Sequence, residues 1–131
     1  MRVVLCFFFA LFTAPAWAEW VEVGRGEDQS SIAYADPTAI TPVGENVSML
    51  HLWNLRTPET ISAGKKYLSI RTRTEFNCRE EKTRRLIYEA FAGNMAQGEV
   101  MVTSDPAPGD WKPVPPVSLM RNIWKVACGK Q

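Results

Sequence analysis

The sequence contains a single histidine, His51, which is the first residue to consider for acid–base chemistry. His51 lies in the middle of residues 47–56, an apolar segment rich in strand-forming residues that predicts a central strand. A general base needs a partner that orients its ring, and the spacing of the acidic residues identifies none. A lone histidine in a strand is more often a hydrogen-bonded structural residue, so we assign His51 no catalytic role.

Motifs for other kinds of chemistry are missing from the sequence. It has no GxSxG nucleophile elbow, no HExxH zinc motif and no phosphate-binding P-loop. The two glycines of Gly24-Arg25-Gly26 lack the remaining glycine of a dinucleotide-binding fingerprint. We therefore predict no enzymatic activity, no cofactor and no metal site.

Two of the three cysteines are placed to form a disulfide. Cys6 lies in an N-terminal segment that reads as a cleaved signal, which leaves Cys78 and Cys128. These two are too far apart in sequence for a redox CxxC motif or a zinc site. An even pair in an exported domain is most simply a disulfide. Closing a loop of about 50 residues would stabilise the fold by roughly 4 kcal/mol in the chain-entropy model.

Arginines and lysines cluster in the middle of the chain, where they could recognise a partner. This candidate protein-binding patch consists of Arg71, Arg73, Arg79, Lys82, Arg84 and Arg85. It would suit an acidic protein segment or another polyanion. The alternative is that neighbouring glutamates, such as Glu75 and Glu89, neutralise the cations in cross-strand pairs that are each worth little.

The first 18 residues are typical of a signal peptide. Arg2 precedes a continuous apolar run over residues 3–12, and Ala16-Trp17-Ala18 supplies small residues for cleavage. The run is too short to span a bilayer as a helix, which needs about 20 residues. We predict that residues 1–18 are removed and that residues 19–131 form one domain with its own core.

The charge balance gives no indication of a strongly charged partner. The sequence has 15 Lys and Arg residues against 14 Asp and Glu residues, and loss of Arg2 makes the two numbers equal. This balance favours neither nucleic acid nor an anionic membrane surface as a partner. We accordingly predict no nucleic-acid binding and no integral membrane span.

Residues 67–78, which end in a cysteine, form the strand that must carry much of the candidate protein-binding patch. Its side chains alternate, so that Ile70 and Phe76 would face the core while Ser69 and Glu75 would face solvent. This period-two pattern predicts a half-buried strand.

The last stretch, residues 118–128, also ends in a cysteine and is the expected partner of that strand. Its apolar side chains, such as Leu119 and Ile123, recur at the three-and-four spacing of an amphipathic helix. Ser118 is the expected N-cap. Such a helix has one apolar stripe, which it must bury against a sheet.

The remaining segments complete a sheet. Further strands are predicted at residues 19–25, 31–34, 47–56, 85–91 and 99–103. A loop is predicted at residues 57–66, and a solvated turn is predicted in the charged run that begins at residue 79. Residues 93–98 are predicted as a hairpin connection, and the proline-rich residues 105–116 as an extended connection. Trp53 is expected in the core. The fold class is therefore α+β, with about six mostly antiparallel strands and one C-terminal helix tied by a disulfide.

Several short motifs follow one another in a recognisable order. They are Trp20-Val21, Tyr34-Ala35-Asp36-Pro37, Leu52-Trp53, Tyr67-Leu68-Ser69, Phe76-Asn77-Cys78, Trp111 before Pro115-Pro116-Val117-Ser118, and Trp124-Lys125-Val126-Ala127-Cys128. The ordered set covers nearly all of the mature chain and resembles the surface-adhesin protein E family of bacterial envelope proteins. The resemblance implies an antiparallel sheet whose concave face holds a C-terminal helix through a disulfide. It also implies adhesion to host extracellular-matrix or plasma proteins, without defining a binding residue.

Three function hypotheses follow. The first is a non-enzymatic protein-binding module that is exported to the periplasm, the outer-membrane surface or the medium. The second is a periplasmic enzyme or accessory factor that works through His51. The third is a small-ligand carrier with a cavity between sheet and helix. An open His51 beside a carboxylate would favour the second hypothesis, and a large cavity under the helix would favour the third.

Overall fold

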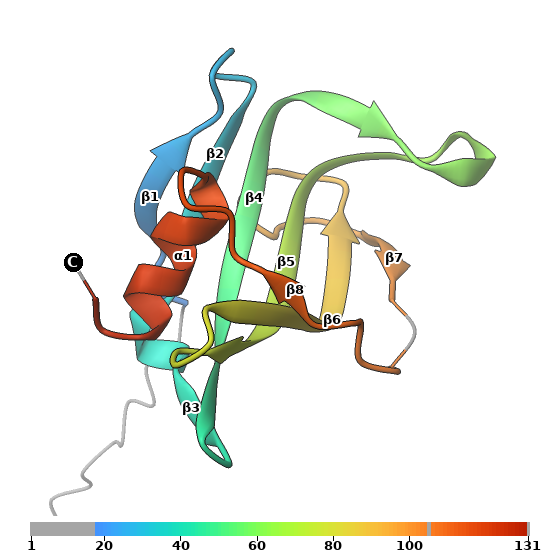
Figure 1. Cartoon of the computed structure of the whole chain (residues 1–131). Coiled ribbons are helices and arrows are strands. Elements are labelled where there is room, and N and C mark those ends of the chain that lie inside the picture. Colours follow the sequence, from blue (N-terminus) through green and yellow to red (C-terminus); the bar gives the residue numbers. More distant parts are fainter. Residues whose placement is uncertain (1–17, 105, 131) are drawn as a thin grey trace, which may run out of the picture.

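The computed structural model describes residues 18–104 and 106–130, in which a curved antiparallel sheet carries one α-helix (Figure 1). Residues 1–17 of the expected signal peptide lie outside the described residues. The strands are β1 (Val21–Arg25), β2 (Ser31–Ala35), β3 (Thr41–Val43), β4 (Asn46–Thr60), β5 (Lys66–Asn77), β6 (Lys82–Phe91), β7 (Val100–Thr103) and β8 (Lys112–Pro113), and the helix is α1 (Leu119–Ala127). Their order is β1-β2-β4-β5-β6-β7, with β3 paired to β4 and β8 to β6. The predicted fold class is confirmed, with two more strands than expected.

The central hairpin of β4 and β5 is longer than the sequence suggested, and the predicted loop over residues 57–66 is wrong. β4 continues to Thr60, and a short 3-10 turn at Ser62–Gly64 leads to β5. The register of the two strands shifts between Asn54 and Glu59. Pro58 lies in this irregular part of the β4–β5 pairing. Proline has no N–H to donate, but the regular hydrogen bonds between the strands are interrupted here, so none is lost. The hairpin end projects well beyond the rest of the sheet (Figure 1).

The charged turn after β5 is shorter than expected, because β6 begins at Lys82. The Asn77 side chain closes the turn, as its Oδ1 accepts the backbone N–H of Arg79 at 3.1 Å and of Glu80 at 2.9 Å. The following charges lie in a strand and not in a solvated turn, because they have partners across the sheet. Glu75 of β5 lies opposite Arg84 of β6.

The later connections agree better with the predictions. Residues 93–98 join β6 to β7 as an antiparallel hairpin, as expected. The proline-rich connection is largely extended, with residue 105 outside the described part, and it contributes the two-residue strand β8 opposite Lys82 and Thr83. This connection carries the chain back across the sheet to α1.

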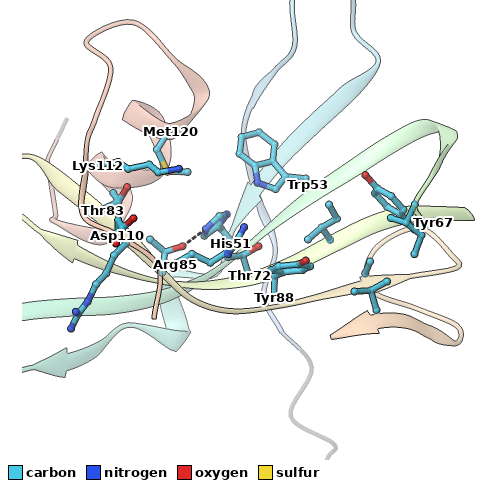
Figure 2. A pocket seen from close by; sticks show the side chains of 17 residues that line it. His51, Trp53, Tyr67, Thr72, Thr83, Arg85, Tyr88, Asp110, Lys112 and Met120 are labelled. Carbon is cyan, nitrogen blue, oxygen red and sulfur yellow. Dashed lines mark hydrogen bonds between the residues drawn. The ribbon is translucent and has the colours of Figure 1, made fainter. Parts of the chain in front are cut away.

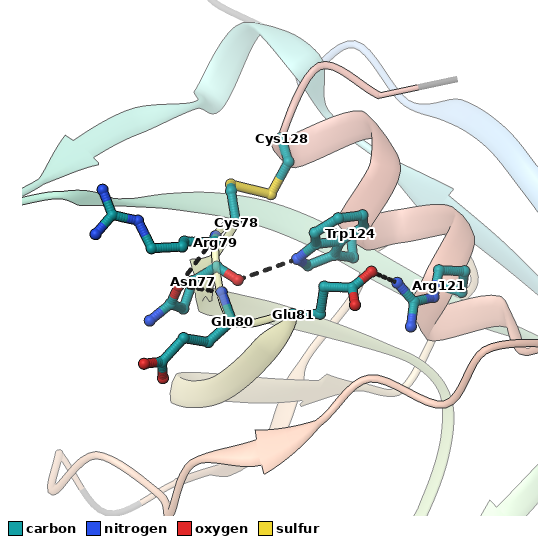
Figure 3. Close-up of a disulfide and its surroundings, with 8 residues drawn as sticks. All are labelled: Asn77, Cys78, Arg79, Glu80, Glu81, Arg121, Trp124 and Cys128. Atoms are coloured by element: carbon teal, nitrogen blue, oxygen red, sulfur yellow. Dashed lines mark hydrogen bonds and ion pairs between the residues drawn. A yellow bond between two sulfur atoms is a disulfide. The ribbon is translucent and has the colours of Figure 1, made fainter.

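The helix α1 begins and ends as its sequence predicts. Ser118 is the N-cap, and its Oγ accepts the N–H of Arg121 at 3.0 Å. At the other end Cys128 forms the predicted disulfide with Cys78, which follows β5 (Figure 3). Close to this disulfide the Trp124 indole Nε1–H donates to the Asn77 carbonyl oxygen at 3.3 Å. The helix is therefore fixed to the end of the central strand by a covalent bond and a hydrogen bond.

The core lies between α1 and the half of the sheet formed by β1, β2 and β4. Its buried members include Ala33, Ala35, Met49, Phe76, Val114, Ile123, Trp124 and Ala127. Small residues under the helix allow the close approach. A Cβ atom at Gly24 would lie 2.6 Å from Leu119 Cδ2, so a larger residue there would push the Leu119 side chain aside. The helix covers only part of the sheet and leaves the β5–β7 side open (Figure 1).

Candidate functional site

The sheet has two faces, which the register distinguishes. The inner face is the one that α1 covers, and it carries Met49 and Phe76. On the outer face, Leu50 of β4, Arg73 of β5 and Ile87 of β6 lie side by side in one cross-strand row. Neighbouring rows on the outer face place Leu52, Arg71 and Glu89 on one side and Ser48, Glu75 and Arg84 on the other.

Two of the predicted patch arginines on the outer face have carboxylate partners. Arg71 Nη2 contacts Glu89 Oε1 at 2.7 Å, and its guanidinium lies 5.1 Å from the centre of the Phe91 ring. Arg84 donates from Nε and Nη2 to Glu75 Oε1, at 3.0 and 2.8 Å. These pairs neutralise the two arginines, as the alternative interpretation of the patch had suggested.

Arg73 differs from these neighbours. Its Nη1 donates to Ser48 Oγ at 3.3 Å, and no described carboxylate forms an ion pair with it. It lies between half-buried Leu50 and Ile87, which is 39% exposed. The centre of the outer face thus has a cation that no described carboxylate neutralises, with apolar side chains on both sides.

The other predicted patch residues lie elsewhere. Arg79 is exposed in the turn, and Lys82 at the start of β6 contacts Glu80 at 3.6 Å. Arg85 lies on the inner face, because a bulge between Arg73 and Thr74 places it opposite Thr74. The six cations therefore do not share one surface.

The outer face is less exposed than strand alternation predicted. Ser69, expected in solvent, is fully buried because the β6–β7 connection folds over it. Its Oγ donates to the Gly93 carbonyl oxygen at 2.6 Å and accepts the Ala96 N–H at 3.0 Å. Glu75 is also buried, and Asn46 Nδ2 donates to its second carboxylate oxygen at 2.8 Å. The expectation for these two residues was wrong, since alternation alone does not show what packs on a face.

A hollow of about 660 Å³, which we call the inner hollow, occupies the part of the inner face that the helix leaves uncovered (Figure 2). Its floor comes from β4, β5, β6 and β7, and its lining includes His51, Trp53, Thr72, Tyr88 and Met120. Trp53, predicted in the core, packs against the core cluster on one side and lines the inner hollow on the other. The sequence contained one indication of the inner hollow. The side chains of Thr72 and Thr74, at inward-facing positions, are too small and too polar to fill a core.

His51 is buried in the floor of the inner hollow, with 1% of its surface exposed. Its Nε2 is 2.7 Å from Thr74 Oγ1, and its Nδ1 has no hydrogen-bond partner among the described residues. A bare acceptor at Nδ1 costs less than an orphaned N–H, so we assign the proton to Nε2. Burial lowers the pKa of His51 to about 4, so the ring is neutral at pH 7. Neither an open ring nor a carboxylate partner, which the enzyme hypothesis requires, is found at this residue.

The described residues, 18–104 and 106–130, contain neither a metal cluster nor a membrane-spanning helix. No group of three or more His, Cys, Asp and Glu side chains there is arranged to hold a metal ion. Within the same residues no helix is long and apolar enough to cross a membrane.

The curved sheet, the C-terminal helix and the disulfide between them define a small sheet-and-helix domain of the class found in bacterial surface adhesins. The model of the family described as surface-adhesin protein E matches residues 20–129, and the chain therefore belongs to this family. The family is one of surface adhesins and not a class of enzymes, which indicates an exported or cell-surface protein.

Solved structures of Haemophilus influenzae protein E have the same fold. One has a TM-score of 0.63 at 14% identity, covering 82% of this chain and 83% of that chain. A second crystal form has a TM-score of 0.62 at 14% identity, covering 86% and 97%. Protein E from non-typeable Haemophilus influenzae has a TM-score of 0.58 at 15% identity, covering 85% and 84%. A search of curated proteins gives no match.

Proposed function

We propose that residues 19–131 form an exported, non-enzymatic adhesion module that binds a host extracellular-matrix or plasma protein through the outer face. Membership of the surface-adhesin protein E family supports the adhesive role. The choice of the outer face rests on one observation: Arg73 has no carboxylate partner among the described residues, whereas Arg71 and Arg84 have one each.

The surroundings of Arg73 indicate the kind of segment that would bind. An arginine is suited to a carboxylate, with which it can form two parallel hydrogen bonds. Leu50 and Ile87 on either side provide apolar surface, so the complementary segment would combine an acidic residue with an apolar one. The paired Arg71 and Arg84 would form a polar border whose charges are already satisfied.

The binding test uses the purified mature domain on surfaces coated with basement-membrane extract or with plasma protein. We expect saturable binding that weakens as salt is raised, because a charge pair contributes to it. Arg73→Glu should reduce the affinity at least about tenfold, since it replaces attraction by repulsion. Lys130→Glu is the control with the same change of charge, at an exposed C-terminal residue away from the outer face.

Two results would count against this role. Equal binding of the Arg73→Glu and Lys130→Glu domains would exclude the outer face as the binding surface. Location is tested separately by treating intact cells with protease. Protection of the protein in intact cells, together with no binding to either coating, would exclude adhesion.

A further inference from the structure

The inner hollow is apolar at one end. One cross-strand row of its floor consists of Trp53, Ile70, Ala90 and Val102, from four adjacent strands. Tyr67 lies beyond this row at the same end of the hollow (Figure 2), and its hydroxyl donates to Glu59 Oε2 of the long hairpin at 2.8 Å. An apolar chain placed here would contact side chains of the same character along the whole row.

The opposite end of the inner hollow is polar and carries a net positive charge. Arg85 lies there opposite Thr74, and Lys112 and Asp110 reach the same end from the proline-rich connection (Figure 2). This connection is fixed over β6 by the Gly109 N–H, which donates to the Arg85 carbonyl oxygen at 2.8 Å. Two cations against one carboxylate favour an anion at this end.

Arg85 is available for such an anion. Its guanidinium lies 4.5 Å from the centre of the Tyr88 ring, and no described carboxylate forms an ion pair with it. Stacking on an aromatic ring leaves the N–H groups at the guanidinium edge free to donate hydrogen bonds. Arg84, which also borders the hollow, is by contrast already bound to Glu75.

We propose that the inner hollow binds an elongated amphipathic carboxylate of the fatty-acid type. The acyl chain would lie along the row of Ile70, Ala90 and Val102, and the carboxylate would pair with Arg85 and Lys112. The volume of about 660 Å³ is in the range of small-molecule sites. The site faces away from the outer face, so this inference does not depend on the adhesive role.

The direct test is calorimetric titration of the mature domain with dodecanoate, kept below its micelle concentration. We expect saturable binding of one molecule per domain. Decanoate, two methylene groups shorter, should bind about fifteenfold more weakly, because each buried methylene contributes about fourfold. Decanol should bind at least about fivefold more weakly than decanoate, because it lacks the charge that the cationic end would recognise.

Matched variants test each end of the hollow. Arg85→Gln should weaken dodecanoate binding at least about fivefold, whereas Arg79→Gln, at a cation in the turn outside the hollow, should leave it unchanged. Val102→Glu places a charge at the apolar end and should abolish binding. Val100→Glu is its control, at a residue of the same strand that is 43% exposed and does not line the hollow. Circular dichroism of each variant checks that the domain is folded.

Three results would overturn the proposal. The first is the absence of saturable dodecanoate binding by the folded domain. The second is equal affinity for decanoate and decanol, which would show that the cationic end is not used. The third is an equal effect of Arg85→Gln and Arg79→Gln on the affinity for dodecanoate. None of these results bears on the adhesion test, which depends on Arg73 of the opposite face.

Discussion

The imidazole of His51 shows how burial determines the behaviour of a titratable residue in this protein. The ring lies between Trp53 and Phe76, with ring centroids 6.2 and 6.4 Å away, and its Nε2 is committed to Thr74. Protonation would place a charge in this environment, and the pKa is therefore lowered to about 4. Its role is to support the floor of the inner hollow in the neutral form.

This lowered pKa predicts an acid-sensitive stability. Between pH 6.5 and pH 4 the unfolded chain binds a proton at His51 and the folded chain does not, so stability falls as the pH falls. Lowering the pH from 7.5 to 5 should cost about 2 kcal/mol from this residue alone. Urea unfolding at the two pH values measures the loss. His51→Gln should be less sensitive to pH over this range, and an unchanged sensitivity would contradict the lowered pKa.

Residue-level predictions from the sequence were reliable where local chemistry decides and unreliable where tertiary packing decides. Ser118 was identified as the N-cap because a serine before an apolar helical run needs only the neighbouring N–H groups. Arg85 was included in one candidate patch with Arg73 because both lie in the same cation-rich part of the sequence. A single bulge in the register places Arg85 on the opposite face, and the local sequence pattern does not predict this bulge.

At the level of elements, the helix and the strand that end in cysteines were the most predictable parts of the fold. Each has a strong periodicity, 3.6 residues for α1 and two for β5, and their cysteines allowed one pairing in the mature chain. The loop over residues 57–66 was predicted wrongly because proline and glycine usually end a strand. In a hairpin with an irregular register, Pro58 is tolerated within a strand.

The disulfide between these two elements is expected to contribute much of the stability. Replacing both Cys78 and Cys128 by serine should lower the free energy of unfolding by up to about 4 kcal/mol, because the unfolded chain regains the entropy of a loop of 50 residues. Thermal unfolding should shift down by about 10 °C or more. The native domain treated with a reductant is the control and should unfold like the double variant. If the double variant and the native domain had equal thermal stability under non-reducing conditions, the disulfide would not stabilise the fold.

For the molecule as a whole, the two faces of one sheet provide two separate candidate sites. The outer face presents Arg73 between apolar neighbours, and the inner face contains the hollow beside α1. The sequence predicted the cations and the helix from which these surfaces arise. It could not predict the inner hollow as a volume, because that depends on how far α1 and the proline-rich connection extend over the sheet.

The two ends of the described chain meet in the folded domain. Asn122 of α1 donates from Nδ2 to the Val23 carbonyl oxygen of β1 at 2.9 Å, across 99 residues of sequence. A chain that ends after Ser118 should therefore be unfolded and rapidly degraded by protease, because Met49 and Phe76 would lose their cover. A chain that ends after Cys128 is the control and should resist protease like the full domain. Equal resistance of both truncated chains would show that the sheet folds without its helix.

This meeting of first strand and last helix also sets the order of events for a protein that is exported N-terminus first. β1 emerges long before the residues that cover it, Leu119 and Asn122, because 99 residues separate Val23 from Asn122. Cys128 emerges later still, so the disulfide cannot form until α1 has also crossed the membrane. The chain would therefore pass through the membrane without its final fold, and the domain would acquire its stability in one step on the far side.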